Sequence, residues 1–163
     1  MTDKKIDIGC GPCPKKGYDA YIDVYKHPKI AGNPEIDSKF TIACAEDLSM
    51  FEDKEFEYAW CHHVIEHVQD PAKACAEIMR ISKSGIFHFP SVEIEILCGR
   101  DDHNWMVFPD YNKKHLLFIK KRFKSFYGQG GKKRIPVEEA RRWIAQQQKP
   151  FEWKDSFTWT VVL

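Results

Sequence analysis

An acidic residue and a pair of glycines stand at the end of the first apolar stretch of the sequence, in Ile6-Asp7-Ile8-Gly9-Cys10-Gly11-Pro12. The two isoleucines predict a short buried strand, and Gly-x-Gly predicts a tight loop without side chains directly after it. In an open α/β sheet, small molecules bind beyond the carboxyl ends of the strands, where such a loop exposes bare backbone. The stretch therefore predicts a ligand cradle, with an ordinary turn as the alternative.

A second carboxylate, Asp23, ends the next strand candidate, residues 20–24. An acidic residue at this place can accept hydrogen bonds from both hydroxyls of a ribose, as in dinucleotide-binding folds, where it follows the glycines by about twenty residues. Here the spacing is shorter, because residues 9–19 hold two prolines that disfavour a crossover helix. We expect a loop or a single turn there, and a surface aspartate is the alternative for Asp23.

Two histidines flank a glutamate in His63-Val64-Ile65-Glu66-His67. The spacing His-x-x-Glu-His occurs on one helix face in a class of zinc peptidases. Because the motif directly follows a strand candidate and no distant third ligand stands out, a peptidase using His63, Glu66 and His67 is a remote alternative. Cys10-x-x-Cys13 has no partner motif, so we expect free thiols and no metal ligands.

Strands and helices alternate in the part of the chain that must position these residues. Apolar stretches predict strands over residues 20–24, 40–44, 57–61 and 86–90 in addition to the first one. Asp70-Pro71 predicts the start of a helix with an apolar face that continues to Ile81, and Lys83-Ser84-Gly85 predicts its end. This order predicts a doubly wound α/β fold with a Rossmann-like, mostly parallel sheet and shortened crossovers after strands one and two.

The last third of the chain has a less regular pattern. We expect residues 93–97 to extend the fifth strand and residues 99–105 to form a polar loop. A helix over 111–123, a flexible break at 128–131, a second helix over 137–148 and a closing strand over 157–162 follow.

Length and charge limit the organisation of the molecule. A chain of 163 residues fits one domain, with residues 1–92 as a cofactor-binding part and residues 93–163 as an acceptor-side part. We expect an intracellular, cytoplasmic protein without a membrane span, because no bilayer-length apolar run and no secretion signal is present. Residues 111–149 carry 12 Lys and Arg against 2 Asp and Glu, so either an anionic partner such as nucleic acid or a solvated helix face is expected.

The order of these motifs resembles the class I S-adenosylmethionine-dependent methyltransferases, especially the small enzymes similar to the ubiquinone and menaquinone biosynthesis group. IDIGCGP resembles the first motif of the family, YIDV its ribose-binding strand end, AEDLSMF its adenine-side loop, and FEYAWCHHVIEHVQDP its fourth strand with the connection that follows. The resemblance covers about residues 5–92. It implies that the chain binds S-adenosylmethionine and releases S-adenosylhomocysteine.

The same resemblance implies a set of cofactor contacts. The methionine amine and carboxylate would contact Asp7 and the backbone of Gly9, Cys10 and Gly11, and the ribose would contact Asp23 and Val24. The adenine would contact Cys44, Ala45 and Glu46, and the methionine arm would contact Cys61, His62 and His63. Cys44 departs from the family, which often has at this place an Asp that bonds the adenine amino group.

Methyl transfer from a sulfonium requires little of the protein beyond alignment of the acceptor and exclusion of water, and positioning alone is worth roughly 7–11 kcal/mol. No shared catalytic residue is therefore expected. His103, in the polar loop 99–105, could serve as a general base for a hydroxyl or amine acceptor, and a structural hydrogen bond is its alternative role.

These inferences predict methyl transfer from S-adenosylmethionine to an unidentified acceptor, with a small molecule as the first expectation. A non-catalytic binding module of the same fold, with residues 111–149 engaging an anionic partner such as nucleic acid, is the alternative. Shortened layers can leave apolar surface uncovered, so a homodimer is a further expectation.

Overall fold

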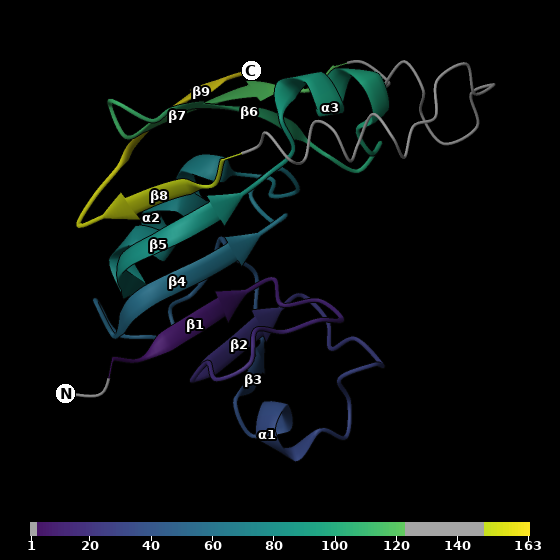
Figure 1. The fold of residues 1–163 in the computed structure, drawn as a ribbon, viewed down its shortest axis with the longest axis vertical. Helices are drawn as coiled ribbons and strands as arrows, with labels where there is room; N and C mark the ends of the chain where they lie inside the picture. Colours follow the sequence, from purple (N-terminus) through teal and green to yellow (C-terminus); the bar gives the residue numbers. More distant parts are fainter. Residues whose placement is uncertain (1–2, 123–148) are drawn as a thin grey trace.

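The computed structural model describes residues 3–122 and 149–163, which form two sheets and three helices. The larger sheet has the strand order β3-β2-β1-β4-β5-β8, and the smaller has the order β6-β7-β9 (Figure 1). The elements are β1 (Lys5–Ile8), β2 (Ala20–Asp23), α1 (Pro34–Asp37), β3 (Phe40–Ile42), β4 (Phe56–His62), α2 (Pro71–Ile81), β5 (Ser82–His88), α3 (Val92–Cys98), β6 (Trp105–Asp110), β7 (His115–Lys120), β8 (Phe151–Lys154) and β9 (Thr158–Val162).

The first five strands form a parallel sheet whose chain order reverses at β1. β1 pairs in parallel with β2 on one side, where Ile8 lies opposite Ile22, and with β4 on the other, where Ile8 lies opposite Cys61. Ile6 and Ile8 are fully buried, as expected for a strand covered on its core face. The predicted Rossmann-like, mostly parallel sheet with reduced crossovers after its first two strands is confirmed, and β8 closes its edge antiparallel to β5.

Helix α2 covers the core face of the sheet and lies behind β4 and β5 in Figure 1. The side chain of Asp70 accepts a hydrogen bond from the Lys73 amide at 3.1 Å, and Pro71 occupies the first turn, so the predicted start of the helix is confirmed. The helix ends at Ile81, as the extent of its apolar face predicts, but the predicted break at Lys83-Ser84-Gly85 is wrong, because β5 begins at Ser82 without an intervening loop.

Gly85 lies inside β5, at a place where the sheet has no room for a side chain. A Cβ atom on Gly85 would lie 2.6 Å from the Ala59 carbonyl oxygen on β4 and 3.0 Å from the Trp153 ring on β8. The ring of Trp153 packs against the space that a side chain would occupy. The local sequence around Gly85 predicts the end of a helix, but in the structure this glycine is required by packing inside a strand.

Two predictions for the last third are wrong. Residues 93–97 lie in the helix α3, whose start is capped by the Ser91 hydroxyl, and do not extend the fifth strand. The predicted helix over 111–123 is also wrong in its described part, where residues 115–120 form the strand β7, which pairs with β6 and β9. In β7, Leu116 and Phe118 are fully buried while the residues between them are half-buried, which is the period of a strand.

The closing strand predicted over 157–162 is confirmed as β9, whereas β6 and β8 escaped prediction. The predicted break at 128–131, the predicted helix over 137–148 and most of the basic segment 111–149 lie outside the described residues. No described helix combines the length and the apolarity that a bilayer crossing requires.

We predict that Gly85→Ala destabilises the fold by about 1–3 kcal/mol, the usual cost of overpacking a core. The added methyl must displace the backbone of β4 or the ring of Trp153. Urea unfolding followed by far-UV circular dichroism measures the change. Lys83→Ala, at an exposed position of the same strand, is the control and should shift stability by less than about 1 kcal/mol; equal effects would contradict the packing argument.

Candidate functional site

A cavity of about 860 Å³ opens at the carboxyl ends of β1, β2, β3 and β4. This is the edge at which open α/β sheets bind ligands, beside the point where strand order reverses. The volume lies within the range of small-molecule sites. The sequence motifs and this cavity therefore coincide.

The floor of the cavity is the glycine loop after β1. Gly9 and Gly11 adopt left-handed backbone angles, with φ of +68° and +54°. The amides of Gly9 and Cys10 both donate to the Ile22 carbonyl, at 2.8 and 3.1 Å, so the loop stays attached to β2. A Cβ atom on Gly9 would lie 2.1 Å from a methyl carbon of Val64, in the segment after β4. Glycine is thus required at residue 9 by both backbone angle and packing.

Asp23 bridges the ends of β1 and β2. One carboxylate oxygen accepts from the Gly11 amide at 2.9 Å and the other from the Val24 amide at 2.7 Å. An ionised carboxylate has about four acceptor positions, so two backbone bonds leave half of them available to a ligand. The carboxylate is fixed in orientation before any ligand arrives.

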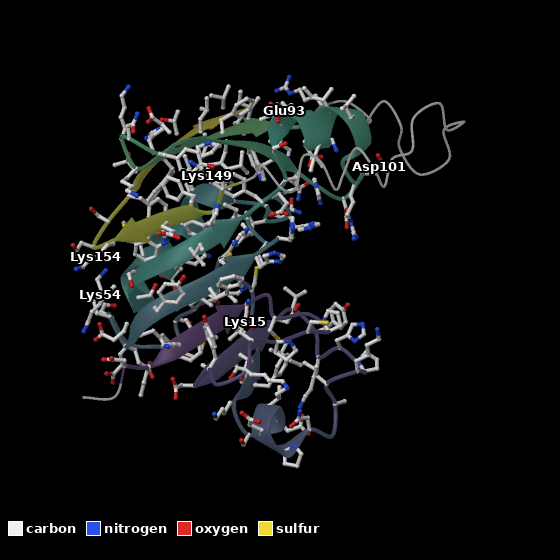
Figure 2. All side chains as sticks on the ribbon, viewed as in Figure 1. Lys15, Lys54, Glu93, Asp101, Lys149 and Lys154 are labelled. Atoms are coloured by element: carbon white, nitrogen blue, oxygen red, sulfur yellow. The ribbon has the colours of Figure 1, made fainter. Side chains whose placement is uncertain are left out.

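Asp7 is the buried carboxylate of the site. It is 2 % exposed, and burial raises its pKa from 3.8 to about 6, although the Lys15 amide donates to it at 2.7 Å. The ammonium of Lys15 lies 3.8 Å from the centre of the Trp60 ring, a cation–π contact on β4. Figure 2, where Lys15 is labelled, shows it in front of β1 and β4. The cavity thus has a buried carboxyl group, Asp7, at its bottom and an ammonium group, Lys15, at its side.

Imidazoles line the end of β4. The ring of His62 stacks on Trp60 at 6.0 Å, and burial lowers its pKa to about 4, so His62 is neutral at pH 7. The His63 ring reaches the Glu66 carboxylate at 2.9 Å, and its backbone has φ of +55°. Val64, His67 and Val68 continue the wall toward Arg100 and Asp102.

Residues 17–89 match the family model of a methyltransferase domain. The match runs from just before β2 to just after β5 and therefore includes Asp23, the end of β4 and α2. The recognition of a class I S-adenosylmethionine-dependent methyltransferase is confirmed, whereas the resemblance to the quinone biosynthesis group stays a prediction.

Solved structures similar to the chain include the cyclase SpnF, a protein of Pyrococcus horikoshii OT3 and a SAM-dependent methyltransferase of Methanosarcina mazei. Their identities are 20 %, 23 % and 21 %, with TM-scores of 0.43, 0.46 and 0.46. The alignments cover 52 %, 69 % and 58 % of this chain and 37 %, 60 % and 57 % of the three structures. The chain matches no curated protein. The family assignment thus depends on the domain match.

Most residues predicted to contact the cofactor line this cavity. They are Asp7, Gly9, Cys10, Gly11, Asp23, Val24, Cys44, Ala45, Glu46, His62 and His63. Cys61 does not line it. The side chains of β4 alternate, so Trp60 and His62 face the cavity while Cys61, 1 % exposed, packs in the core. Burial raises the pKa of the Cys61 thiol well above its usual value.

His103 is not a wall residue of the cavity either. It is 7 % exposed, and its Nδ1 lies 2.6 Å from the Glu95 carboxylate on α3. The predicted role as a general base requires contact with the acceptor, which this burial prevents. The alternative, a structural hydrogen bond, agrees with the geometry. His67, packed edge to face against the His103 ring at 4.6 Å, does reach the cavity.

The cavity wall also includes Lys15, Arg100 and Asp102, which were not predicted as contacts, and His67, which was predicted only as a ligand of the remote peptidase alternative. Lys15 follows the glycines closely enough to have been proposed. Arg100 and Asp102 form an ion pair with two hydrogen bonds, at 2.8 and 2.6 Å, on the loop after α3. The position of this loop on the acceptor side was expected from its place in the chain, whereas the side chains that reach the cavity depend on the packing of α3.

The peptidase alternative required His63, Glu66 and His67 on one helix face. Residues 63–69 form turns and no helix in the structure. His63 and His67 point to different partners, the Glu66 carboxylate and the Asp102 carbonyl. The geometry therefore lacks the arrangement on which that alternative depended.

We predict that Gly11→Ala destabilises the protein by about 1–2 kcal/mol, the cost of a left-handed residue with a side chain. Gly9→Ala should cost at least about 1 kcal/mol more, because its methyl also overlaps Val64, whereas the space beside Gly11 is open. Chemical denaturation of both variants gives the difference. Adding Val64→Ala to Gly9→Ala should recover part of the loss, and no recovery would contradict the proposed overlap.

A second prediction concerns pH. Because the folded protein raises the pKa of Asp7 from 3.8 to about 6, ionising Asp7 destabilises the fold as pH rises through this interval. Asp7→Asn removes the ionisation. Its free energy of unfolding relative to wild type should therefore increase by about 2–3 kcal/mol between pH 4 and pH 7, at about 1.4 kcal/mol per pKa unit. Urea titrations at both pH values measure this, and a pH-independent difference would contradict it.

Proposed function

We propose that the protein binds S-adenosylmethionine in the cavity and transfers its methyl group to an acceptor held near His67, Arg100 and Asp102. The observation that carries the proposal is the pair of preoriented carboxylates, Asp7 and Asp23, at the ends of adjacent parallel strands and on one cavity wall. A ligand with a cationic group and a diol, at opposite ends of its length, matches this pair. The family match supports the same ligand.

Asp23 would hold the ribose of the cofactor. Its two oxygens keep their bonds to the Gly11 and Val24 amides and still have lone pairs for two hydroxyl donors. Cys44, Ala45 and Glu46 follow β3 on the same wall and would border the adenine. Glu46 already accepts a hydrogen bond from the Gln69 amide at 2.6 Å, which fixes its side chain.

Asp7 and Lys15 would hold the amino-acid end. The amides of Gly9, Cys10 and Gly11 donate within the protein, so they have no hydrogen left for a carboxylate. The buried carboxylate of Asp7 suits the ammonium group, and the ammonium of Lys15 suits the carboxylate. We therefore assign the carboxylate contact to Lys15 and not to the loop backbone.

The sulfonium of the bound cofactor supplies an activated methyl group, and the residues of this chain orient and shield it. Trp60 and neutral His62 give the wall near the methionine arm an aromatic surface. Such surfaces stabilise a nearby cation by about 0.5–2 kcal/mol. Residues 93–163 contribute Arg100 and Asp102 to the acceptor side, consistent with a single domain in which both parts build one site.

The test is binding of S-adenosylmethionine and S-adenosylhomocysteine to the full chain, measured by isothermal titration calorimetry. Asp23→Asn should weaken both affinities by about 10- to 100-fold, because hydrogen bonds to a charged acceptor are each worth about 1.5–3 kcal/mol. Asp3→Asn, at an exposed carboxylate just before β1, is the matched control and should leave them unchanged. Absence of binding at millimolar ligand would refute the proposal.

Turnover distinguishes the enzyme from a non-catalytic module. Transfer of a labelled methyl group from S-adenosylmethionine to a member of a panel of small acceptors would support methyl transfer. Tight cofactor binding without turnover, together with nucleic-acid binding that weakens steeply with salt, would instead support a binding module.

A further inference from the structure

A group of three metal-ligating side chains lies behind the acceptor side of the cavity. Glu66, His67 and His103 place one ligand atom each within 4.8 Å of one another. Glu66 and His67 come from the turns after β4, and His103 comes from the loop between α3 and β6, where Asp101 is labelled in Figure 2. The third residue differs from the one that the sequence motif suggested, because His63 is replaced by His103.

Glu66 is a buried carboxylate with an unsatisfied oxygen. The residue is fully buried, Oε1 contacts the His63 ring at 2.9 Å, and Oε2 has no hydrogen-bond partner among the described residues. A buried carboxylate oxygen without a donor or a cation is strongly unfavourable, since its desolvation is uncompensated. The site therefore favours a positive charge beside Glu66.

In His67 and in His103, Nδ1 is hydrogen-bonded and Nε2 has no partner among the described residues. Nδ1 of His67 lies 3.2 Å from the Asp102 backbone carbonyl, and Nδ1 of His103 lies 2.6 Å from the Glu95 carboxylate. A backbone carbonyl can only accept, and an ionised carboxylate can only accept, so each Nδ1 carries the proton. Each Nε2 is then left with a lone pair, which is the arrangement of histidine ligands in metal sites.

The Glu95 carboxylate contacts the ring of His103 and the ammonium of Lys121. Lys121, from just beyond β7, donates to Glu95 and to the Arg100 carbonyl. The Glu95 carboxylate therefore supports the site by orienting the His103 ring, and the ammonium of Lys121 offsets the charge of that carboxylate.

We propose that Glu66, His67 and His103 bind one divalent transition-metal ion of the zinc class. Two imidazole nitrogens and one carboxylate oxygen suit Zn²⁺ and its late first-row neighbours, whereas Ca²⁺ and Mg²⁺ prefer oxygen ligands alone. Bonds of about 2.0–2.2 Å require the three ligand atoms to close in on the ion. The ion joins the segment after β4 to the loop after α3, and His67 places it at the cavity wall.

The site is independent of cofactor binding, so its test uses the full chain without S-adenosylmethionine. Calorimetric titration with ZnCl₂ should give one ion per chain, and Co²⁺ should give a visible absorption band at the same stoichiometry. Zn²⁺ should also raise the midpoint of thermal unfolding. Failure here would leave the proposed methyl transfer intact, and failure of cofactor binding would leave the metal site intact.

Variants separate this site from the other histidines. Glu66→Gln and His103→Gln should weaken Zn²⁺ binding by more than about 100-fold, since even loss of a supporting contact costs about 10- to 100-fold. Glu95→Gln should fall in that lower range. His88→Gln is the control, because His88 lies beside His62, at 5.0 Å between ring centres, in a separate group of imidazoles. The affinity of the His88→Gln variant for Zn²⁺ should equal that of wild type.

Thermal unfolding without metal reports whether each variant folds, and His67→Gln provides a second ligand variant if Glu66→Gln does not. Absence of saturable Zn²⁺ binding to the wild type would overturn the proposal. So would a loss in His88→Gln equal to that in His103→Gln, because the ion would then occupy the His62 group. Equal binding of Mg²⁺ would likewise exclude the assigned ligand set.

Discussion

The short connection between β1 and β2 is the constraint on which the site depends. Residues 9–19 must carry the chain from one parallel strand to the next without a helix, so the glycine loop bonds directly to β2 through the Ile22 carbonyl and the Asp23 carboxylate. The loop lies flat at the sheet edge, and left-handed angles at Gly9 and Gly11 make this possible. The backbone of the glycine loop, together with the carboxylates of Asp7 and Asp23, thus forms the cavity floor.

This arrangement determines the electrostatics of the cavity. Because the loop amides are already bonded within the protein, the floor offers carboxylates at Asp7 and Asp23 and few free donors. Positive charge enters from the side, at Lys15 over Trp60 and at Arg100 paired with Asp102. A ligand that carries both charges, as an amino-acid group does, can pair its cation with the carboxylates of the floor and its anion with the cations at the side.

The acceptor side is stabilised by buried polar contacts between distant segments. The Glu66 carbonyl accepts from the amides of Asn104 and Trp105, and the Trp105 ring nitrogen donates to the Val68 carbonyl at 2.8 Å. These bonds attach the segment after β4 to the start of β6. The smaller sheet therefore serves as the support on which one wall of the cavity is built, although its strands contribute no residue to that wall.

Local signals in the sequence determined the parallel strands, the start of α2, the glycine loop and the two carboxylates of β1 and β2. These features depend on neighbours in the chain: apolar pairs, a proline after an N-cap aspartate, and glycines where φ is positive. Only the tertiary structure decided the rest. The apolar run of β7 fits either period until pairing with β6 and β9 selects the strand, and Gly85 ends no helix because Trp153 and the Ala59 carbonyl fill its side-chain space. His103 and His67, far apart in sequence, meet because α3 returns the chain to the end of β4, and no pattern within either segment contains that information.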